Sequence, residues 1–156
     1  MRLIVVAVGH RMPAWVQSGV DEYARRLRQT ARLDLIVVKS ERRSSAMGPE
    51  RAMMLEEARV EAALPSDCYR VILDERGEQV SSVEFAQKLL TWRGVGREVA
   101  LIVGGADGLS ARFTVSANML LALSRMTLPH GLARVLLAEQ LYRAISIMHN
   151  HPYHRE

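Results

Sequence analysis

Four apolar runs rich in β-branched residues recur along the chain and alternate with segments of a different period. The runs cover residues 3–8, 35–38, 69–73 and 99–103. They are apolar at nearly every position rather than at every second one, which is typical of strands buried on both faces of a parallel sheet. We therefore predict four strands with helices on both sides of their sheet.

Three segments between these runs have helical spacing. Residues 13–29 open with Pro13 and place apolar side chains three and four positions apart, which predicts an amphipathic helix. Residues 49–63 predict a second, more charged helix. A third begins at Ser81, where a serine cap is followed by an acid in the first turn.

The last third of the chain predicts two further elements. Residues 119–123 are apolar and favour a fifth strand, although the period alone does not separate it from a helix. Residues 132–149 have a wide apolar face and predict a long helix. The alternation of strand and helix indicates an α/β fold, a mainly parallel sheet flanked by helices. Ligands of such sheets bind at the carboxyl ends of the strands.

Length and residue usage narrow the class of protein. With 156 residues, the chain fits one domain over residues 1–156. Its longest apolar stretch, residues 3–8, is far shorter than the ~20 residues that cross a bilayer, and no secretory signal follows it. Cys68 is the single cysteine, which excludes an intrachain disulfide and a thiolate metal cluster. We expect a cytoplasmic protein that makes no contact with a membrane.

Charge gives only weak support for a nucleic-acid partner. The net charge is +4, and 19 of the 21 basic residues are arginine, whose planar fork suits phosphate and stacks on bases. A GC-rich genome that favours arginine codons accounts for the same bias equally well. A basic patch would indicate nucleic acid, whereas a basic total does not.

Two glycine-containing segments are candidates for ligand contact. Residues 103–110 follow a predicted strand and contain three glycines, so a backbone could approach a ligand closely there. The spacing matches neither a dinucleotide fingerprint nor a phosphate loop, and a plain turn is an equal alternative. Residues 73–77 read as a strand end followed by a surface turn. Residues 39–51 are charged and read as a mobile surface loop.

The C-terminal segment combines unusual chemistry in few residues. His149 and His151 have no cysteine or carboxylate at ligand spacing, so we expect no metal. Pro152 ends the preceding helix, and residues 153–156 are expected to form an extended tail outside the core. This tail carries a phenol, an imidazole, a guanidinium and a carboxylate, a mixture suited to gripping a nucleotide.

Several segments have specific sequences, and they are "AVGHRMPAWV", "EYARRL", the glycine loop at residues 103–110, "LSRMTLPH" at residues 123–130, "LAEQLYRA" at residues 137–144 and the terminal "NHPYHRE". These segments closely resemble the RlmH family, the large-subunit ribosomal RNA pseudouridine N3-methyltransferases. The resemblance covers essentially the whole chain, apart from residues 40–66.

The resemblance implies a SPOUT-type fold whose C-terminal part forms a deep trefoil knot. It also implies S-adenosylmethionine as the cofactor, bound by the loops of that knot. The residues that it implies for cofactor binding lie at or after the ends of three predicted strands, so they are expected to converge at one edge of the sheet. The implied cofactor residues are Leu73, Gly104, Leu123, Ser124, Arg125, Met126, Thr127 and Leu128.

The resemblance further implies a homodimer that acts on ribosomal RNA within the assembled ribosome, with the tail helping to build the partner's site. Arg155 is expected to stabilise negative charge on the base, while His154 or Glu156 accepts the N3 proton. Tyr153 and Tyr142 are expected to stack on or orient the base. For Tyr142, a structural role on the last helix is an equal alternative.

Two other functions remain open at this point. A non-catalytic ribosome-binding module of the same fold would bind RNA without transferring a methyl group. An α/β enzyme that uses a nucleotide would need a phosphate loop or an acid after the first glycine turn, and the sequence contains neither pattern.

Overall fold

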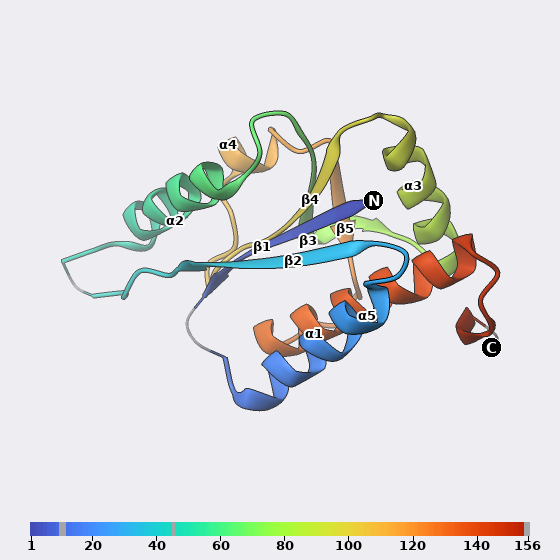
Figure 1. The fold of residues 1–156 in the computed structure, drawn as a ribbon. Helices are drawn as coiled ribbons and strands as arrows, with labels where there is room; N and C mark the ends of the chain where they lie inside the picture. Colours follow the sequence, from blue (N-terminus) through green and yellow to red (C-terminus); the bar gives the residue numbers. More distant parts are fainter. Residues whose placement is uncertain (10–11, 45, 155–156) are drawn as a thin grey trace.

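The computed structural model describes residues 1–9, 12–44 and 46–154, and it shows the predicted alternation of strands and helices (Figure 1). The elements in chain order are β1 Arg2–Gly9, α1 Ala14–Leu27, β2 Arg32–Lys39, α2 Pro49–Ala63, β3 Cys68–Gln79, α3 Ser82–Gly94, β4 Glu98–Val103, α4 Ala111–Thr114, β5 Met119–Ala122, α5 His130–Met148 and a short 3-10 turn, η1, Pro152–His154. The strands form one sheet in the order β2-β1-β4-β3-β5, and every pairing is parallel. The α/β class is confirmed, and residues 119–122 are a strand.

Both faces of the central strands are buried, as their continuous apolar sequence predicts. Along β1, Leu3, Val5 and Ala7 point to one face, where they pack against α1, α3 and α5. Ile4, Val6 and Val8 point to the other face, which α2 and α4 cover. Figure 1 shows α2 and α4 above the sheet and α1 and α5 below it. Because alternate side chains enter two different cores, neither face of β1 can tolerate a polar residue.

The edge strand β2 departs from this pattern. The sequence predicts it as buried on both faces, but most of its side chains are partly exposed, and Val37 is 45% exposed. The reason is its place in the sheet, since β2 pairs only with β1. A sequence run reports apolar character but not the order of strands.

The predicted turn after Leu73 is wrong. β3 continues through Asp74 to Gln79, and its register with β5 shifts, so that Leu121 is opposite first Leu73 and then Glu78. At Gly77, an added Cβ would lie 2.7 Å from backbone atoms of Leu120 and Leu121. The glycine thus permits a close approach of two strands within an irregular strand rather than a turn between elements.

The C-terminal segment also differs from its prediction. Residues 152–154 form the 3-10 turn η1 instead of an extended tail, and the Tyr153 side chain is half-buried against α5. α5 already ends at Met148, before Pro152, and Asn150 takes a left-handed φ of 54°. The chain then folds back, and the Tyr153 ring packs against the ring of Tyr142. Among the described residues, no helix is long and apolar enough to cross a membrane.

Candidate active site

An open cavity of about 650 Å³ lies where β4 and β5 end and α5 begins, beside the middle of β3. This is the edge at which ligands bind in parallel sheets. Its volume falls within the usual range for pockets that hold small molecules. Three segments of the chain form most of the wall, and they are residues 73–76, 103–109 and 121–128.

The structure brings together most of the positions that the sequence assigns to the cofactor. Seven of the eight predicted residues line this cavity, and they are Leu73, Gly104, Leu123, Ser124, Met126, Thr127 and Leu128. The eighth, Arg125, is exposed and does not line it. The convergence of the three segments is therefore as expected, whereas their role in binding stays a prediction.

The glycine loop, residues 104–108, has a tight conformation of its own. The Gly108 amide donates to the Gly105 carbonyl over 3.0 Å, and Gly108 has a φ of +73°. A Cβ at Gly104 would lie 2.9 Å from the carbonyl carbon of Gly108. Glycine is required at these two positions by the fold of the loop itself, because L side chains would clash or strain the backbone.

Carboxylates share the cavity wall with these apolar and backbone groups. Asp74, Glu75 and Asp107 all line it. The Arg76 guanidinium donates to both carboxylate oxygens of Asp74 and lowers the pKa of that carboxyl, so Asp74 is charged near neutral pH. The sequence shows acids after Leu73, but we predicted a surface turn there because acids followed by a glycine are typical of turns.

His130, which the sequence did not single out, also lines the cavity. Burial, and then the charge of Arg134, lower its pKa to about 4, so the imidazole is neutral near pH 7. The Arg134 Nη2 atom lies 3.3 Å from His130 Nε2. A guanidinium only donates, so this contact makes Nε2 the acceptor and leaves the proton on Nδ1. The lone signal available in the sequence was the four-residue spacing of His130 and Arg134.

Tyr142 and Tyr153, which the sequence assigns to the substrate, lie outside the cavity. Tyr153 packs edge-on against Tyr142 with ring centroids 4.6 Å apart, and its hydroxyl donates to Glu139 Oε1 over 3.2 Å. Burial, followed by the neighbouring Tyr23 and Glu139, raises the pKa of Tyr153 to about 12, so the phenol keeps its proton. Arg155 and Glu156 lie outside the described residues, as does the side chain of His154.

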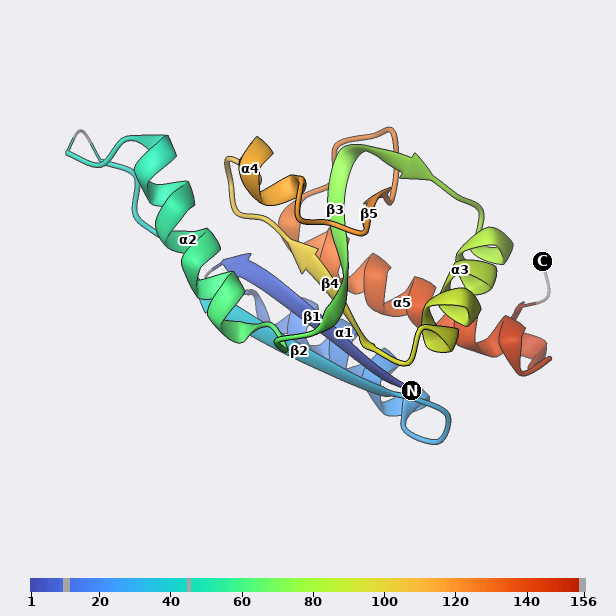
Figure 2. The same cartoon turned by 90° about the horizontal axis from the view of Figure 1, so that it is seen from above.

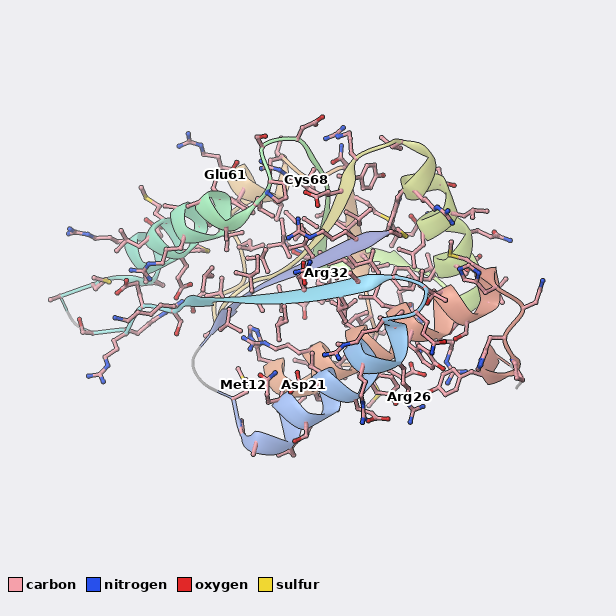
Figure 3. All side chains as sticks on the ribbon, in the orientation of Figure 1. Met12, Asp21, Arg26, Arg32, Glu61 and Cys68 are labelled. Carbon is pink, nitrogen blue, oxygen red and sulfur yellow. The ribbon has the colours of Figure 1, made fainter. Side chains whose placement is uncertain are left out.

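Guanidinium groups complete this aromatic cluster. Arg26 of α1 lies within 6.0 Å of the ring centroids of Tyr23, Tyr142 and Tyr153. Figure 3 labels Arg26 on the side of α1 where the C-terminal turn packs. Arg143 lies 4.9 Å from the Tyr153 ring. The cluster holds the beginning of the tail against α1 and α5.

The cavity and the aromatic cluster are at opposite ends of α5. His130 and Ala133, at its start, line the cavity, whereas Tyr142 and the C-terminal turn belong to its far half. Twelve residues of helix separate His130 from Tyr142, which is about 18 Å. Figure 2 shows the C-terminal turn η1 beyond the far end of α5. Among the described side chains, Tyr142 and Tyr153 therefore do not reach the cavity of their own chain.

Known proteins resemble this chain along its whole length. The family described as "Predicted SPOUT methyltransferase" matches residues 1–154. A protein of Janthinobacterium sp. named ribosomal RNA large subunit methyltransferase H is 54% identical over 155 residues, which are 99% of each chain. A protein of Ralstonia pickettii with the same name is 50% identical over the same share.

Solved structures resemble the fold. A probable methyltransferase from Bordetella pertussis has a TM-score of 0.54 and 16% identity, and the match covers 92% of this chain and 95% of that one. A probable methylase family protein from Haemophilus influenzae has a TM-score of 0.52 and 17% identity, with 96% and 67% covered. At this identity, the likeness concerns the arrangement of the backbone.

Proposed function

The chain belongs to the SPOUT methyltransferase family, and we propose that it methylates N3 of a pseudouridine in large-subunit ribosomal RNA with S-adenosylmethionine. One structural observation carries the assignment of the site. Three segments far apart in the sequence enclose one cavity, and they are residues 73–76 within β3, residues 103–109 after β4 and residues 121–128 at and after the end of β5. Large-subunit ribosomal RNA is named for relatives that share half of this sequence, and N3 of a pseudouridine is what the resemblance to the RlmH family implies.

The residues of the cavity fit this cofactor. Leucines 73, 123 and 128 offer an apolar surface for a flat adenine, and the glycine loop exposes backbone groups that can recognise its edge. Asp74 and Asp107 place carboxylate oxygens in the same wall, where they can accept hydrogen bonds from the ammonium or the ribose hydroxyls of the ligand. Each is also paired with an arginine, Asp74 with Arg76 and Asp107 with Arg43. When bound, S-adenosylmethionine supplies an electrophilic methyl group.

The tail supplies the remaining chemistry. The N3 proton of the base has to leave before the nitrogen can form a bond to carbon. Arg155 stabilises the negative charge that develops on the ring, and His154 or Glu156 accepts the proton. The high pKa of Tyr153 suits a hydrogen-bond donor that orients the base rather than one that removes its proton.

We also propose a homodimer in which the tail of each chain reaches the cavity of its partner. The separation of about 18 Å along α5 supports this arrangement, because Tyr142, against which Tyr153 packs, lies far from the start of α5 that lines that chain's own cavity. Exposed apolar side chains support a partner surface near the cavity. Trp15 is 57% exposed at the start of α1, Leu132 is 42% exposed at the start of α5, and Met126 of the cavity wall is 77% exposed.

Two finer points belong to the same proposal. The C-terminal part of the chain forms the trefoil knot of this family, with the loops at residues 103–109 and 121–128 as its crossing segments. The enzyme works in the cytoplasm on assembled ribosomal particles, because a domain of this size has little surface with which to recognise free RNA.

The experiment that tests the function incubates the purified protein with methyl-labelled S-adenosylmethionine and ribosomal particles. We expect label in large-subunit RNA, at N3 of a pseudouridine when the digested RNA is analysed by mass spectrometry. A naked RNA hairpin of the same sequence serves as the second arm and should be methylated far more slowly. Binding to particles without label transfer would instead support a ribosome-binding module.

A further inference from the structure

The charged segment between β2 and α2, which the family resemblance does not explain, lies beside the glycine loop of the cavity. We propose that Arg43 and Glu56 are positioning residues that fix Asp107, and through it the glycine loop, in the conformation that binds the cofactor. The inference rests on the proposed function, since it concerns the same cavity. It assigns a role to residues 40–57 in the reaction.

Glu56 is the anchor of this arrangement. Its side chain is 1% exposed in the middle of α2. Oε1 accepts a hydrogen bond from the Glu41 amide over 2.8 Å and from Arg43 Nη1 over 2.5 Å, and Oε2 accepts from Arg43 Nη2 over 3.3 Å. A carboxylate buried to this degree is costly unless a cation and hydrogen-bond donors accompany it. Glu56 therefore holds both the backbone at Glu41 and the guanidinium of Arg43.

Arg43 carries this anchorage to the cavity. Its Nε donates to Asp107 Oδ2 over 2.8 Å, and its Nη2 lies 2.6 Å from the same oxygen. One guanidinium thus joins a buried carboxylate of α2 to a carboxylate of the glycine loop. Such charge-assisted contacts with a planar fork are directional, so they restrict where Asp107 can lie.

The glycine loop contains an internal hydrogen bond from Gly108 to Gly105, but its composition makes it costly to order. Three of its five residues are Gly104, Gly105 and Gly108, which carry no side chain and lose much backbone freedom when ordered. Contact with α2 limits that freedom directly at one of them. A Cβ at Gly105 would lie 2.7 Å from Oε2 of Glu56.

A second tether follows immediately after the loop. The amide of Ser110, which is the N-cap of α4, donates to Glu57 Oε1 over 2.6 Å. Adjacent acids of α2 therefore hold both the loop and the residue that ends it. Further ion pairing, between Arg59 of α2 and Glu41, ties the segment before Arg43 to the same helix.

These contacts predict a specific defect when the Arg43 link is removed. A loop that samples more conformations has to lose that freedom on binding, which weakens affinity for the ligand without changing the chemistry of the bound complex. We expect Kd and KM for S-adenosylmethionine to rise about tenfold, with kcat at saturating cofactor and KM for ribosomal particles unchanged. A purely stabilising ion pair would lower the Tm and leave this split absent.

The variants have to avoid leaving Glu56 buried without a partner. The double variant Arg43→Met with Glu56→Gln removes both charges together and keeps an acceptor for the Glu41 amide. Neither of the two substituted residues lines the cavity. Asp107→Asn forms the second arm, because it cuts the link at the loop and leaves the Arg43–Glu56 pair in place. Arg51→Met, on an exposed position of α2, is the matched control.

The measurements are calorimetric titration with S-adenosylmethionine, steady-state methylation, and hydrogen exchange of the full-length protein. We expect weaker binding and faster amide exchange at residues 104–110 in both arms, with Arg51→Met like the wild type. Arg43→Lys should restore part of the affinity, because an ammonium can still pair with one carboxylate. Unchanged affinity in the double variant, or exchange that rises uniformly along the chain, would overturn the positioning role. A wild-type protein that fails to bind the cofactor would instead refute the proposed function.

Discussion

The two ends of α5 serve different purposes, and they are built in different ways. At its start, loops from three strands and the side chain of His130 enclose a cavity whose shape depends on backbone and on α2. At its other end, side chains of α1, α5 and the C-terminal turn stack into a cluster of three tyrosines with Arg26. The first region is concave and ready for a small molecule, whereas the second is filled by its own rings.

This difference is what the proposed homodimer requires of a chain of 156 residues, with a cofactor cavity at one end of α5 and substrate-binding residues at the other. A cofactor site needs a preformed cavity, which the sheet edge provides within one chain. Residues that grip a large substrate need only a short segment that can be presented from outside. In a symmetric dimer, each copy could offer its tail to the cavity of the other, and both sites would be equivalent.

The largest effect should come from the tail. Deleting residues 153–156, or changing Arg155→Ala, should lower the methylation rate by a factor of hundreds, because a lost preorganised charge contact in a transition state costs about 3–4 kcal/mol. The affinity for S-adenosylmethionine should stay near the wild-type value in both variants, since the cavity is lined by residues 73–133 and not by the altered positions. Single-turnover methylation and calorimetry measure the two quantities. Near-normal rates in the truncated protein would remove the tail from catalysis.

The converse defect should appear at the cavity. Gly104→Val places a branched side chain where a Cβ already meets Gly108 and the Leu109 side chain at 2.9–3.0 Å. We expect the affinity for S-adenosylmethionine to fall about a hundredfold, or about 2.7 kcal/mol, because the loop has to open to admit the side chain. Titration calorimetry measures the loss, and circular dichroism checks that the variant folds. A folded variant with unchanged affinity would show that Gly104 is not part of the site.

The sequence could predict the cavity end of α5 better than the tail end. Continuous apolar runs such as residues 3–8 and 99–103 identify the buried parallel strands, and parallel strands necessarily end at a common edge. The loops after β4 and β5 could therefore be placed together without coordinates. Leu73 was placed correctly, although for the wrong reason, since β3 does not turn there but shifts its register.

The rest depends on contacts that no local pattern encodes. Arg43, Glu56 and Asp107 are up to 64 residues apart in sequence, and each reads as one more charged residue on a surface. Pro152 predicted an extended segment, but residues 152–154 form a turn in which the Tyr153 ring contacts the ring of Tyr142. Long-range pairing of this kind decides burial, and burial decides the pKa of His130.

The pH dependence of the free energy of unfolding tests the environment of His130, at the cavity end of α5. The pKa of His130 is about 4 in the folded chain and near 6.5 when unfolded, so the unfolded state binds the additional proton first. The contribution should be complete well above pH 6.5 and decrease as the pH falls to 4. The two pKa values limit the loss to about 3 kcal/mol, and solvent screening of the partly exposed ring reduces it to about 2 kcal/mol. Chemical denaturation at several pH values measures this.

A matched pair of variants separates His130 from the other titrating groups. His130→Gln should lose that part of the pH dependence, whereas His149→Gln, at an exposed position after α5, should keep it. Parallel stability curves for the wild type and His130→Gln between pH 4 and 6.5 would show that the imidazole is not held neutral by the fold.

The smallest effect concerns the packing of the tail. Tyr153→Phe retains the ring contact with Tyr142 and loses the hydroxyl that donates to Glu139, so we expect the free energy of unfolding to fall by about 1 kcal/mol. Tyr153→Ala should cost more because the ring contacts with Tyr142 and Arg143 disappear as well. Urea denaturation distinguishes the two. Equal stability of all three proteins would mean that the tail does not pack on α5 in solution.

Mixing two inactive variants tests the division of the site between copies most directly. Gly104→Val and Arg155→Ala proteins are combined, allowed to exchange subunits, and assayed with ribosomal particles. Half of the dimers should then be mixed, and one of their two sites should pair an intact cavity with an intact tail, so about a quarter of the wild-type activity should return. If each chain uses its own tail, no intact site can form, and the mixture will remain as inactive as its components.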